Sequence, residues 1–249
     1  RAGDAVVVEV AVPACGWTTV RPAAPVAPQN VLIAGERLLE NDLLRMTLNE
    51  KGEITSILDK ALLAAGEPAE LAAGPCNSFK MYKDVPTWYD AWDIDSNYEL
   101  LPVPLDESAV IEVLSSGPLV ATLRVTRKLH GSLMTQEISL RRGSRRVDFV
   151  TRIDWQERHK LLKVAFPVQI HANEAIHEIQ FGHIRRPNHR SRPFDADRFE
   201  VSNHKWTALA QGNRGAAVLN DCKYGVNVLG DSINLTLLKS AMAPDMHAD

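Results

Sequence analysis

Cysteine is scarce in this sequence: only Cys15, Cys76 and Cys222 occur among 249 residues. An odd number of widely spaced cysteines fits neither a disulfide framework nor a zinc-binding pattern. The scarcity favours a reducing compartment, so we expect a cytoplasmic protein.

Long apolar runs are also missing, because residues such as Glu9, Gly66 and Glu67 interrupt every candidate. None approaches the roughly 18 residues that a membrane span needs, which predicts no membrane partner. No basic segment followed by an apolar one opens the chain, so we expect no signal peptide. The first residue is Arg1 rather than Met, and this indicates a fragment or a processed product.

Neither sign of charge dominates, since 28 Lys and Arg residues are balanced by 31 Asp and Glu residues, a net charge of −3. This balance predicts no nucleic-acid partner. The basic segment 141–146 lacks interleaved aromatic residues and is predicted to be a solvated hairpin tip. A hydrophobic share of 45% supplies enough apolar side chains for a core without disulfides or a structural metal.

The dominant pattern in the sequence is the period-two alternation of β-strands. Residues 43–48 and 54–58 flank Gly52 and predict a hairpin, with glycine at the positive-φ position. Further strands are predicted at residues 109–114, 119–129, 132–140, 146–155, 161–170, 176–181, 215–220 and 233–238. Strands at about ten-residue spacing without alternating helices predict an all-β fold, a large antiparallel sandwich.

Two segments interrupt this pattern. Residues 61–75 are rich in Ala and Leu and predict a short helix or an irregular covering loop. Residues 21–29 are rich in Pro and Ala and predict a linker after an opening strand at residues 6–10. The linker predicts a boundary between residues 1–28 and a main domain at residues 29–249.

Four aromatic and three acidic side chains crowd into residues 86–98: Trp88, Tyr89, Asp90, Trp92, Asp93, Asp95 and Tyr98. Aromatic faces combined with carboxylates that accept hydrogen bonds from hydroxyls suit a carbohydrate site. The alternative is a packed loop whose Trp residues fill the core and whose Asp residues cap turns. A glycosidase acid/base pair would need a carboxylate separation that sequence cannot give.

Four histidines recur every six residues, at His171, His177, His183 and His189. Residues six apart on one strand lie about 20 Å from each other, too far to share a metal ion, so we expect no metal site. The basic segment 185–190 follows a predicted strand. Its donors could bind hydroxyl groups or an adjoining domain, and the alternative is a charged surface loop.

Six blocks of this sequence carry a resemblance to a known family: residues 39–60, 89–95, 154–167, 180–187, 198–206 and 219–225. Together, and in this order, they resemble the carboxy-terminal half of glycoside hydrolase family 38, the α-mannosidases. The resemblance implies a galactose-mutarotase-like β-supersandwich at residues 29–249. Residues 1–28 would then be remnant strands of a preceding small β domain and a linker.

The resemblance also implies a function: part of a retaining, zinc-dependent α-mannosidase that hydrolyses terminal α-mannosides. In that family the zinc ion, the nucleophile and the acid/base carboxylate belong to an amino-terminal catalytic domain. We therefore expect no catalytic residue, metal ligand or cofactor in this chain, and no activity of the chain alone. The expected partners are that catalytic domain and mannose-containing glycans, and a homo-oligomer is left open.

The substrate-binding residues predicted from this resemblance lie in two segments. Asp90, Trp92 and Asp93 are the first candidates for the edge of the catalytic cleft, and Arg185 and Arg186 are the second. Two alternatives stay open. One is a stand-alone carbohydrate-binding module, and the other is a mutarotase-like epimerase that uses Glu178 and His183 as base and acid.

Overall fold

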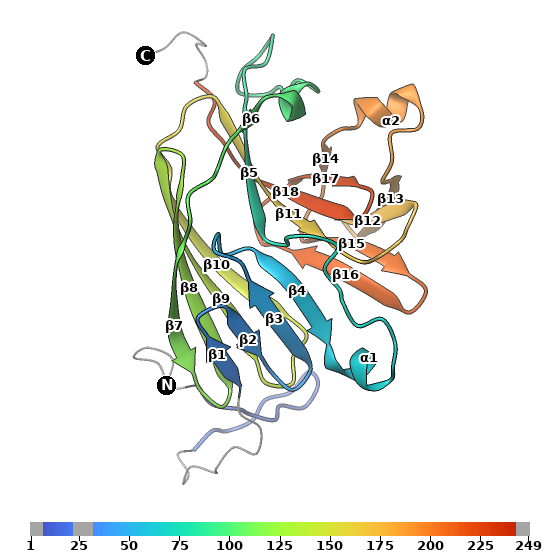
Figure 1. The fold of residues 1–249 in the computed structure, drawn as a ribbon. Helices are drawn as coiled ribbons and strands as arrows, with labels where there is room; N and C mark the ends of the chain where they lie inside the picture. The colour runs from blue at the N-terminus through green and yellow to red at the C-terminus, as the bar shows by residue number, and fades with distance from the viewer. Residues whose placement is uncertain (1–6, 22–31, 243–249) are drawn as a thin grey trace.

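The computed structural model describes residues 7–21 and 32–242, which form eighteen strands and three short helical turns. Figure 1 shows the two sheets formed by residues 33–59 and 110–154 packed together on one side of the molecule, with the other two sheets beside them. No helix within the described ranges is long and apolar enough to cross a membrane.

The first sheet has the order β1-β2-β3-β4 and the second has the order β10-β9-β8-β7. Their strands are β1 (Ile33–Gly35), β2 (Leu38–Glu40), β3 (Leu44–Leu48), β4 (Ile54–Asp59), β7 (Val110–Ser116), β8 (Val120–Leu129), β9 (Ser132–Arg141) and β10 (Val147–Asp154). The predicted hairpin at 43–58 is confirmed, and Gly52 has a φ of 77° in its turn. A Cβ at Gly52 would lie 2.4 Å from Val125 Cγ1, so only glycine permits this close approach of the two sheets.

The third and fourth sheets have the orders β14-β17-β18-β11-β5-β6 and β13-β12-β15-β16. Their strands are β5 (Ser78–Lys83), β6 (Pro102–Val103), β11 (Lys160–Pro167), β12 (Glu174–Ile179), β13 (Gly182–Pro187), β14 (Val201–Ser202), β15 (Trp206–Gln211), β16 (Arg214–Leu219), β17 (Gly225–Leu229) and β18 (Ser232–Lys239). Strand β11 pairs on both edges, with β18 and β5, and five consecutive residues of it are buried. This central strand carries Lys163, which belongs to a buried polar cluster next to the candidate site.

Helical structure is confined to α1 (Lys60–Ala64), α2 (Pro193–Asp197) and the 3₁₀ turn η1 (Tyr98–Leu100) among the described residues. The predicted short helix at 61–75 is confirmed only for its first residues. Asp59 caps α1, because its Oδ1 accepts hydrogen bonds from the Ala61 and Leu62 amides at 2.9 and 3.3 Å.

The prediction of an all-β protein is confirmed, but the prediction of one large supersandwich is wrong. The strands belong to four separate antiparallel sheets, arranged more like four blades than like a single sandwich. The physical reason is that alternation reveals which residues form strands, whereas hydrogen-bond pairing between distant strands decides the sheets.

The strands predicted before the main domain are not present in the described part of residues 1–28. Residues 7–21 contain no strand, and all of them are exposed. Residues 1–6 and 22–28 of the predicted unit lie outside the described residues. The boundary between residues 28 and 29 therefore stays a prediction.

Candidate functional site

The turn that follows β5 exposes large aromatic side chains. Trp88 and Tyr89 are exposed, and Trp92 is 78% exposed. The Tyr89 and Trp92 rings meet edge to face with centroids 6.2 Å apart. The backbone amides of Trp92 and Asp93 both donate to the Tyr89 carbonyl, at 2.8 and 2.9 Å, and close the turn. The interpretation of residues 86–98 as a loop whose Trp residues fill the core is therefore wrong for Trp88 and Trp92.

Asp90, in contrast, is buried beneath this turn and only 3% exposed. Its Oδ2 accepts a hydrogen bond from the Met242 backbone amide at 2.5 Å. Its Oδ1 lies 3.6 Å from His159 Nδ1, and neither atom has a hydrogen-bond partner among the described residues. Tyr89 and His159 both have positive φ, at 51° and 46°, so the backbone on each side of this contact is strained. Asp90 secures the turn from beneath.

Lys239, at the end of β18, fixes the turn at a second point. Its Nζ donates to Asp84 Oδ2 at 2.6 Å and to the Asp93 carbonyl at 2.7 Å. Burial raises the pKa of Asp84, and the Lys239 ammonium opposes that rise. Asp93 is half-buried, and its carbonyl is the group that Lys239 binds. Asp95 closes the other end, where its Oδ2 accepts from the Thr87 amide and hydroxyl, both at 2.9 Å.

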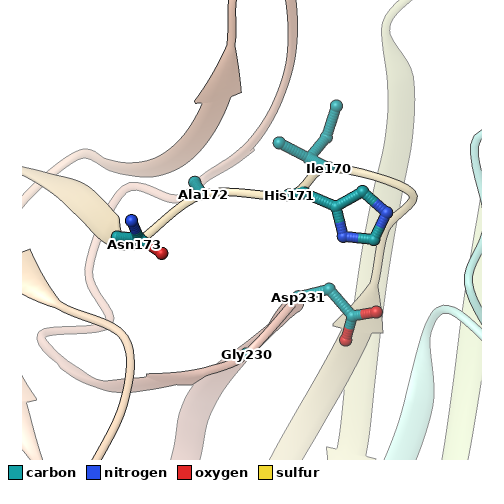
Figure 2. A pocket seen from close by; sticks show the side chains of 6 residues that line it. All are labelled: Ile170, His171, Ala172, Asn173, Gly230 and Asp231. Atoms are coloured by element: carbon teal, nitrogen blue, oxygen red, sulfur yellow. The ribbon is translucent and has the colours of Figure 1, made fainter.

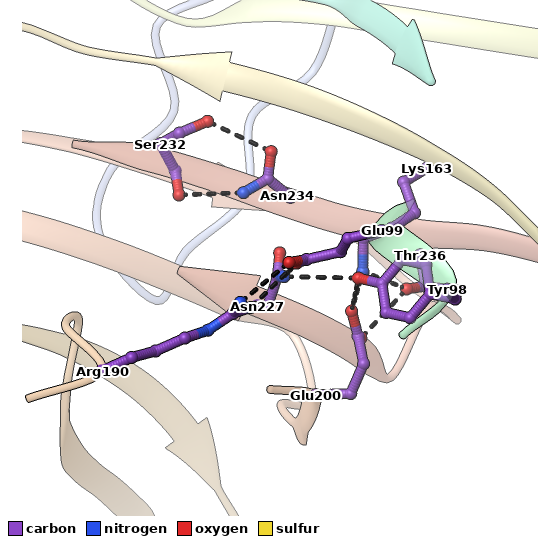
Figure 3. Close-up of polar contacts among 9 residues, drawn as sticks. All are labelled: Tyr98, Glu99, Lys163, Arg190, Glu200, Asn227, Ser232, Asn234 and Thr236. Atoms are coloured by element: carbon purple, nitrogen blue, oxygen red, sulfur yellow. Dashed lines mark hydrogen bonds and ion pairs between the residues drawn. The ribbon is translucent and has the colours of Figure 1, made fainter. Parts of the chain in front are cut away.

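A buried polar cluster lies under η1, directly after the turn (Figure 3). Lys163 of β11 is 2% exposed and forms an ion pair with Glu200. The Tyr98 hydroxyl donates to Glu200 Oε1 at 2.8 Å, and Lys163 Nζ donates to Thr236 Oγ1 at 2.8 Å. Burial lowers the pKa of Lys163, and the Glu200 carboxylate opposes that change. Burial and the same carboxylate raise the pKa of Tyr98. We call Tyr98, Lys163, Glu200 and Thr236 the enclosed cluster.

An ion pair connects η1 with the segment after β13. Arg190 Nη1 and Nη2 donate to the two carboxylate oxygens of Glu99, both at 2.8 Å. Asn227 Nδ2 donates to Glu99 Oε1 at 3.2 Å (Figure 3). The Arg190 guanidinium holds the pKa of Glu99 below its usual value, against the effect of burial. Residues about 90 positions apart are thereby held side by side.

The two predicted arginines lie on strand β13 rather than in a loop. Arg185 is exposed and Arg186 is half-buried. Arg186 Nη1 donates to the Ser202 carbonyl at 3.1 Å, and its side chain lines a small cavity. No hydrogen bond or ion pair within residues 7–21 and 32–242 joins either arginine to Asp90, Trp92 or Asp93. The structure therefore groups the three residues of the turn together but does not bring Arg185 and Arg186 into direct contact with them.

A wider depression of about 580 Å³ lies elsewhere and contains none of the predicted residues. Figure 2 shows His171, Asn173 and Asp231 around it, together with Ile170, Ala172 and Gly230. Sequence reasoning did not point to this depression, because its residues come from two turns about 60 positions apart.

The histidine series does not form a metal site in the described part of the chain, where no cluster of three or more His, Cys, Asp or Glu residues could hold a metal ion. His177 is buried and its Nδ1 lies 3.1 Å from Thr207 Oγ1. Burial, and to a smaller extent Arg186, lower the pKa of His177 to about 4. Glu178 and His183 are opposite each other on β12 and β13, but the Glu178 carboxylate already accepts from the Lys205 amide.

Comparison with known proteins identifies the class to which this fold belongs. A solved α-mannosidase from Enterococcus faecalis V583 has the same fold, with a TM-score of 0.67 at 15% sequence identity over 84% of this chain and 26% of that one. The family model described as glycosyl hydrolases family 38 C-terminal domain matches residues 39–247. The chain belongs to this family, as the resemblance predicted.

Individual relatives are α-mannosidases by name. Alpha-mannosidase 2C1 of Homo sapiens is 36% identical over 250 residues, which cover 96% of this chain and 24% of the relative. Alpha-mannosidase G of Dictyostelium discoideum is 36% identical over 221 residues, which cover 87% of this chain and 20% of the relative. This chain thus spans about a quarter of the length of the curated relatives that it matches.

Proposed function

We propose that this chain is the carboxy-terminal part of a retaining, zinc-dependent α-mannosidase that hydrolyses terminal α-mannosides of mannose-containing glycans in the cytoplasm. Membership of the family over residues 39–247 supports this proposal, as do the names of the relatives. In the proposed enzyme the chain works beside an amino-terminal catalytic domain, and it is inactive alone.

The observation that carries the proposal is the aromatic turn, with Trp92 exposed above a buried, charged support. An exposed indole face supported by a fixed backbone can stack on the apolar face of a sugar ring. In the proposed site, Trp92 contacts the mannoside at the edge of the cleft. Asp90 acts indirectly, because it holds the turn from beneath, and the half-buried Asp93 accepts hydrogen bonds from sugar hydroxyls. Arg185 and Arg186 form a second, more distant contact region.

Kinetics of the full-length protein on an aryl α-mannoside test the role of the turn. Replacement Trp92→Ala should raise KM about three- to tenfold, because one stacking contact is lost. Trp17→Ala is the matched control, since Trp17 is equally exposed, at 82%, but lies outside the turn. Unchanged kinetics of Trp92→Ala in a normally folded protein would refute the role of the turn while leaving the family unaffected.

The zinc ion and the stereochemistry need separate tests. We place the zinc ion in the catalytic domain, and the described residues of this chain do not form a metal-binding cluster for it. The full-length protein should lose activity on chelation and regain it with zinc. Its first product should be the α-anomer by NMR, as retention requires. A β-anomer would contradict the retaining mechanism.

A stand-alone carbohydrate-binding module is the second candidate, favoured by the same exposed aromatic turn. Titration of this 249-residue chain with mannose separates the two proposals. Saturable binding that Trp92→Ala abolishes, together with an inactive full-length protein, would support the module. Activity of the full-length protein would support the mannosidase.

A further inference from the structure

A second, smaller cavity lies between β13, α2 and β17, away from the aromatic turn. Its volume is about 30 Å³, and its polar lining includes Arg186, Arg198, His177, Asp195 and Asn227. Arg198 begins one of the blocks that carry the resemblance, but the sequence analysis did not predict it as a binding residue. Strand β13 supplies Arg186, and the residue that ends α2 supplies Arg198.

The positive charges of this cavity lack compensation within the described ranges. Neither Arg186 nor Arg198 forms an ion pair there. The Arg186 guanidinium donates to a neutral carbonyl, that of Ser202. Arg198 places its Cζ 5.4 Å from the centre of the Phe194 ring. The one carboxylate in the lining, Asp195, accepts two hydrogen bonds from Arg192, at 2.9 and 3.1 Å.

The remaining polar groups add no negative charge. Burial lowers the pKa of Arg186, and the nearby positive charge of Arg198 lowers it further. His177, with a pKa of about 4, is neutral at pH 7. Asn227 is buried, with only 7% of its surface exposed, and its Oδ1 has no hydrogen-bond partner in the part of the chain that is described. The cavity therefore offers two cations and a free acceptor.

The size of the cavity limits what can enter it. One water molecule needs about 10–15 Å³ of such space, so about 30 Å³ admits two or three oxygen-sized atoms. A carboxylate, or the oxygen edge of a phosphoryl group, fits this space, whereas a pyranose ring does not. The planar guanidinium of arginine matches the geometry of either oxyanion.

We propose that this cavity binds a single oxyanion group, the carboxylate or phosphoryl group of a small anionic ligand, between Arg186 and Arg198. The site is separate from the aromatic turn. It shares Arg186 with the second contact region of the proposed function, but anion binding there does not require mannosidase activity. A hydroxyl on a protonated phosphoryl group would also satisfy Asn227 Oδ1.

Calorimetric titration of the full-length protein, with inorganic phosphate and separately with acetate, tests this site. Saturable binding of at least one anion is expected. Arg198→Gln should weaken it about tenfold or more, since a charge-assisted hydrogen bond is lost. Arg198→Lys keeps the charge without the fork and should fall between Arg198→Gln and the unchanged protein. Arg152→Gln is the matched control, because Arg152 on β10 is exposed and forms no ion pair with another described residue. It should bind within about twofold of the unchanged protein.

The titrations distinguish phosphorylated from carboxylated ligands, and they also show whether the cavity binds an anion at all. Tighter binding of phosphate supports a phosphorylated ligand, and tighter binding of acetate supports a carboxylated one. The proposal is overturned if neither anion saturates, or if Arg152→Gln weakens binding as much as Arg198→Gln does. Because Arg198 is exposed, its replacement should leave the circular dichroism spectrum unchanged. Mannoside hydrolysis is measured separately, since it tests the proposed function and not the anion site.

Discussion

Lys163 and Arg186 are both basic residues on strands of the later sheets, but their surroundings differ. Lys163 lies in the enclosed cluster, where Glu200 neutralises it and Thr236 accepts its hydrogen bond. Arg186 has a second cation, Arg198, beside it and no carboxylate of its own among the described residues. A buried cation with a complete set of partners contributes to the folded state, whereas cations gathered around a cavity without an anion are available to a ligand.

The largest effect is expected from the enclosed cluster. Lys163→Met leaves the Glu200 carboxylate without its cation in a buried position. The free energy of unfolding should fall by about 3–5 kcal/mol, as measured by urea denaturation. The double replacement Lys163→Met with Glu200→Leu should restore part of that loss, because no uncompensated charge remains. A loss below about 1 kcal/mol would mean that water reaches Glu200. Lys163 would then not differ from Arg186 in being fully neutralised by a buried partner.

The partly exposed pair of Glu99 and Arg190 should show an intermediate effect. Both side chains are about one-third exposed, so solvent screens the interaction despite its bidentate geometry. Arg190→Gln should lower the free energy of unfolding by about 1 kcal/mol. Arg152→Gln serves as the control for loss of one positive charge. Equal losses of unfolding free energy in the two variants would mean that the ion pair between Glu99 and Arg190 does not stabilise the protein.

The contribution of the Glu99–Arg190 pair to the free energy of unfolding should also depend on pH, and this effect is smaller. Because Arg190 lowers the pKa of Glu99 below its ordinary 4.5, the folded protein holds this carboxylate ionised to lower pH than the unfolded chain does. The stabilisation is therefore complete above the unfolded pKa and is lost as pH falls through the folded value. The difference in unfolding free energy between unchanged protein and Arg190→Gln should shrink on acidification. A difference that stays constant would contradict the assignment.

The smallest effect, with the opposite sign, is expected in the cavity. Arg198→Gln removes repulsion with Arg186, so stability should rise by up to about 0.5 kcal/mol at low salt. Added salt should abolish this gain, since exposed charges are screened. Thermal unfolding at two ionic strengths measures it. If Arg198→Gln destabilises the protein as Arg190→Gln does, Arg198 has a partner and the comparison between cluster and cavity is wrong.

About half of the strands of this fold could be predicted, and the sheets could not. Alternation predicted the positions of β8 and β9 within one residue, and Gly52 marked the hairpin turn, because both signals are local. Several other strands were missed. One of them is β5, since Ser78–Lys83 lies between two irregular segments. The four-sheet arrangement depends on pairing such as β11 with β18, whose residues are about 70 positions apart.

The candidate site was predictable only in part, for a similar reason. The aromatic composition of residues 86–98 pointed to the exposed turn, but not to the burial of Asp90, which depends on Met242. Lys163 and Glu200 lie in two of the blocks that carry the resemblance, but the sequence could not show that they pair, because 37 residues separate them. Arg186 was predicted as a substrate-binding residue, whereas the position of Arg198 beside it could be seen only from the fold.

The contacts that Lys239 and Met242 make with the aromatic turn have a consequence for folding order. They join residues 146 and 152 positions apart, so closing them costs more chain entropy than closing any hairpin. The turn should therefore consolidate after β18 has joined its sheet. In hydrogen exchange, the amides of Trp92 and Asp93 should open together with that of Met242, as one unit less stable than the central strands. The surface that carries Trp92 is thus among the last parts of the chain to become ordered and among the first to open.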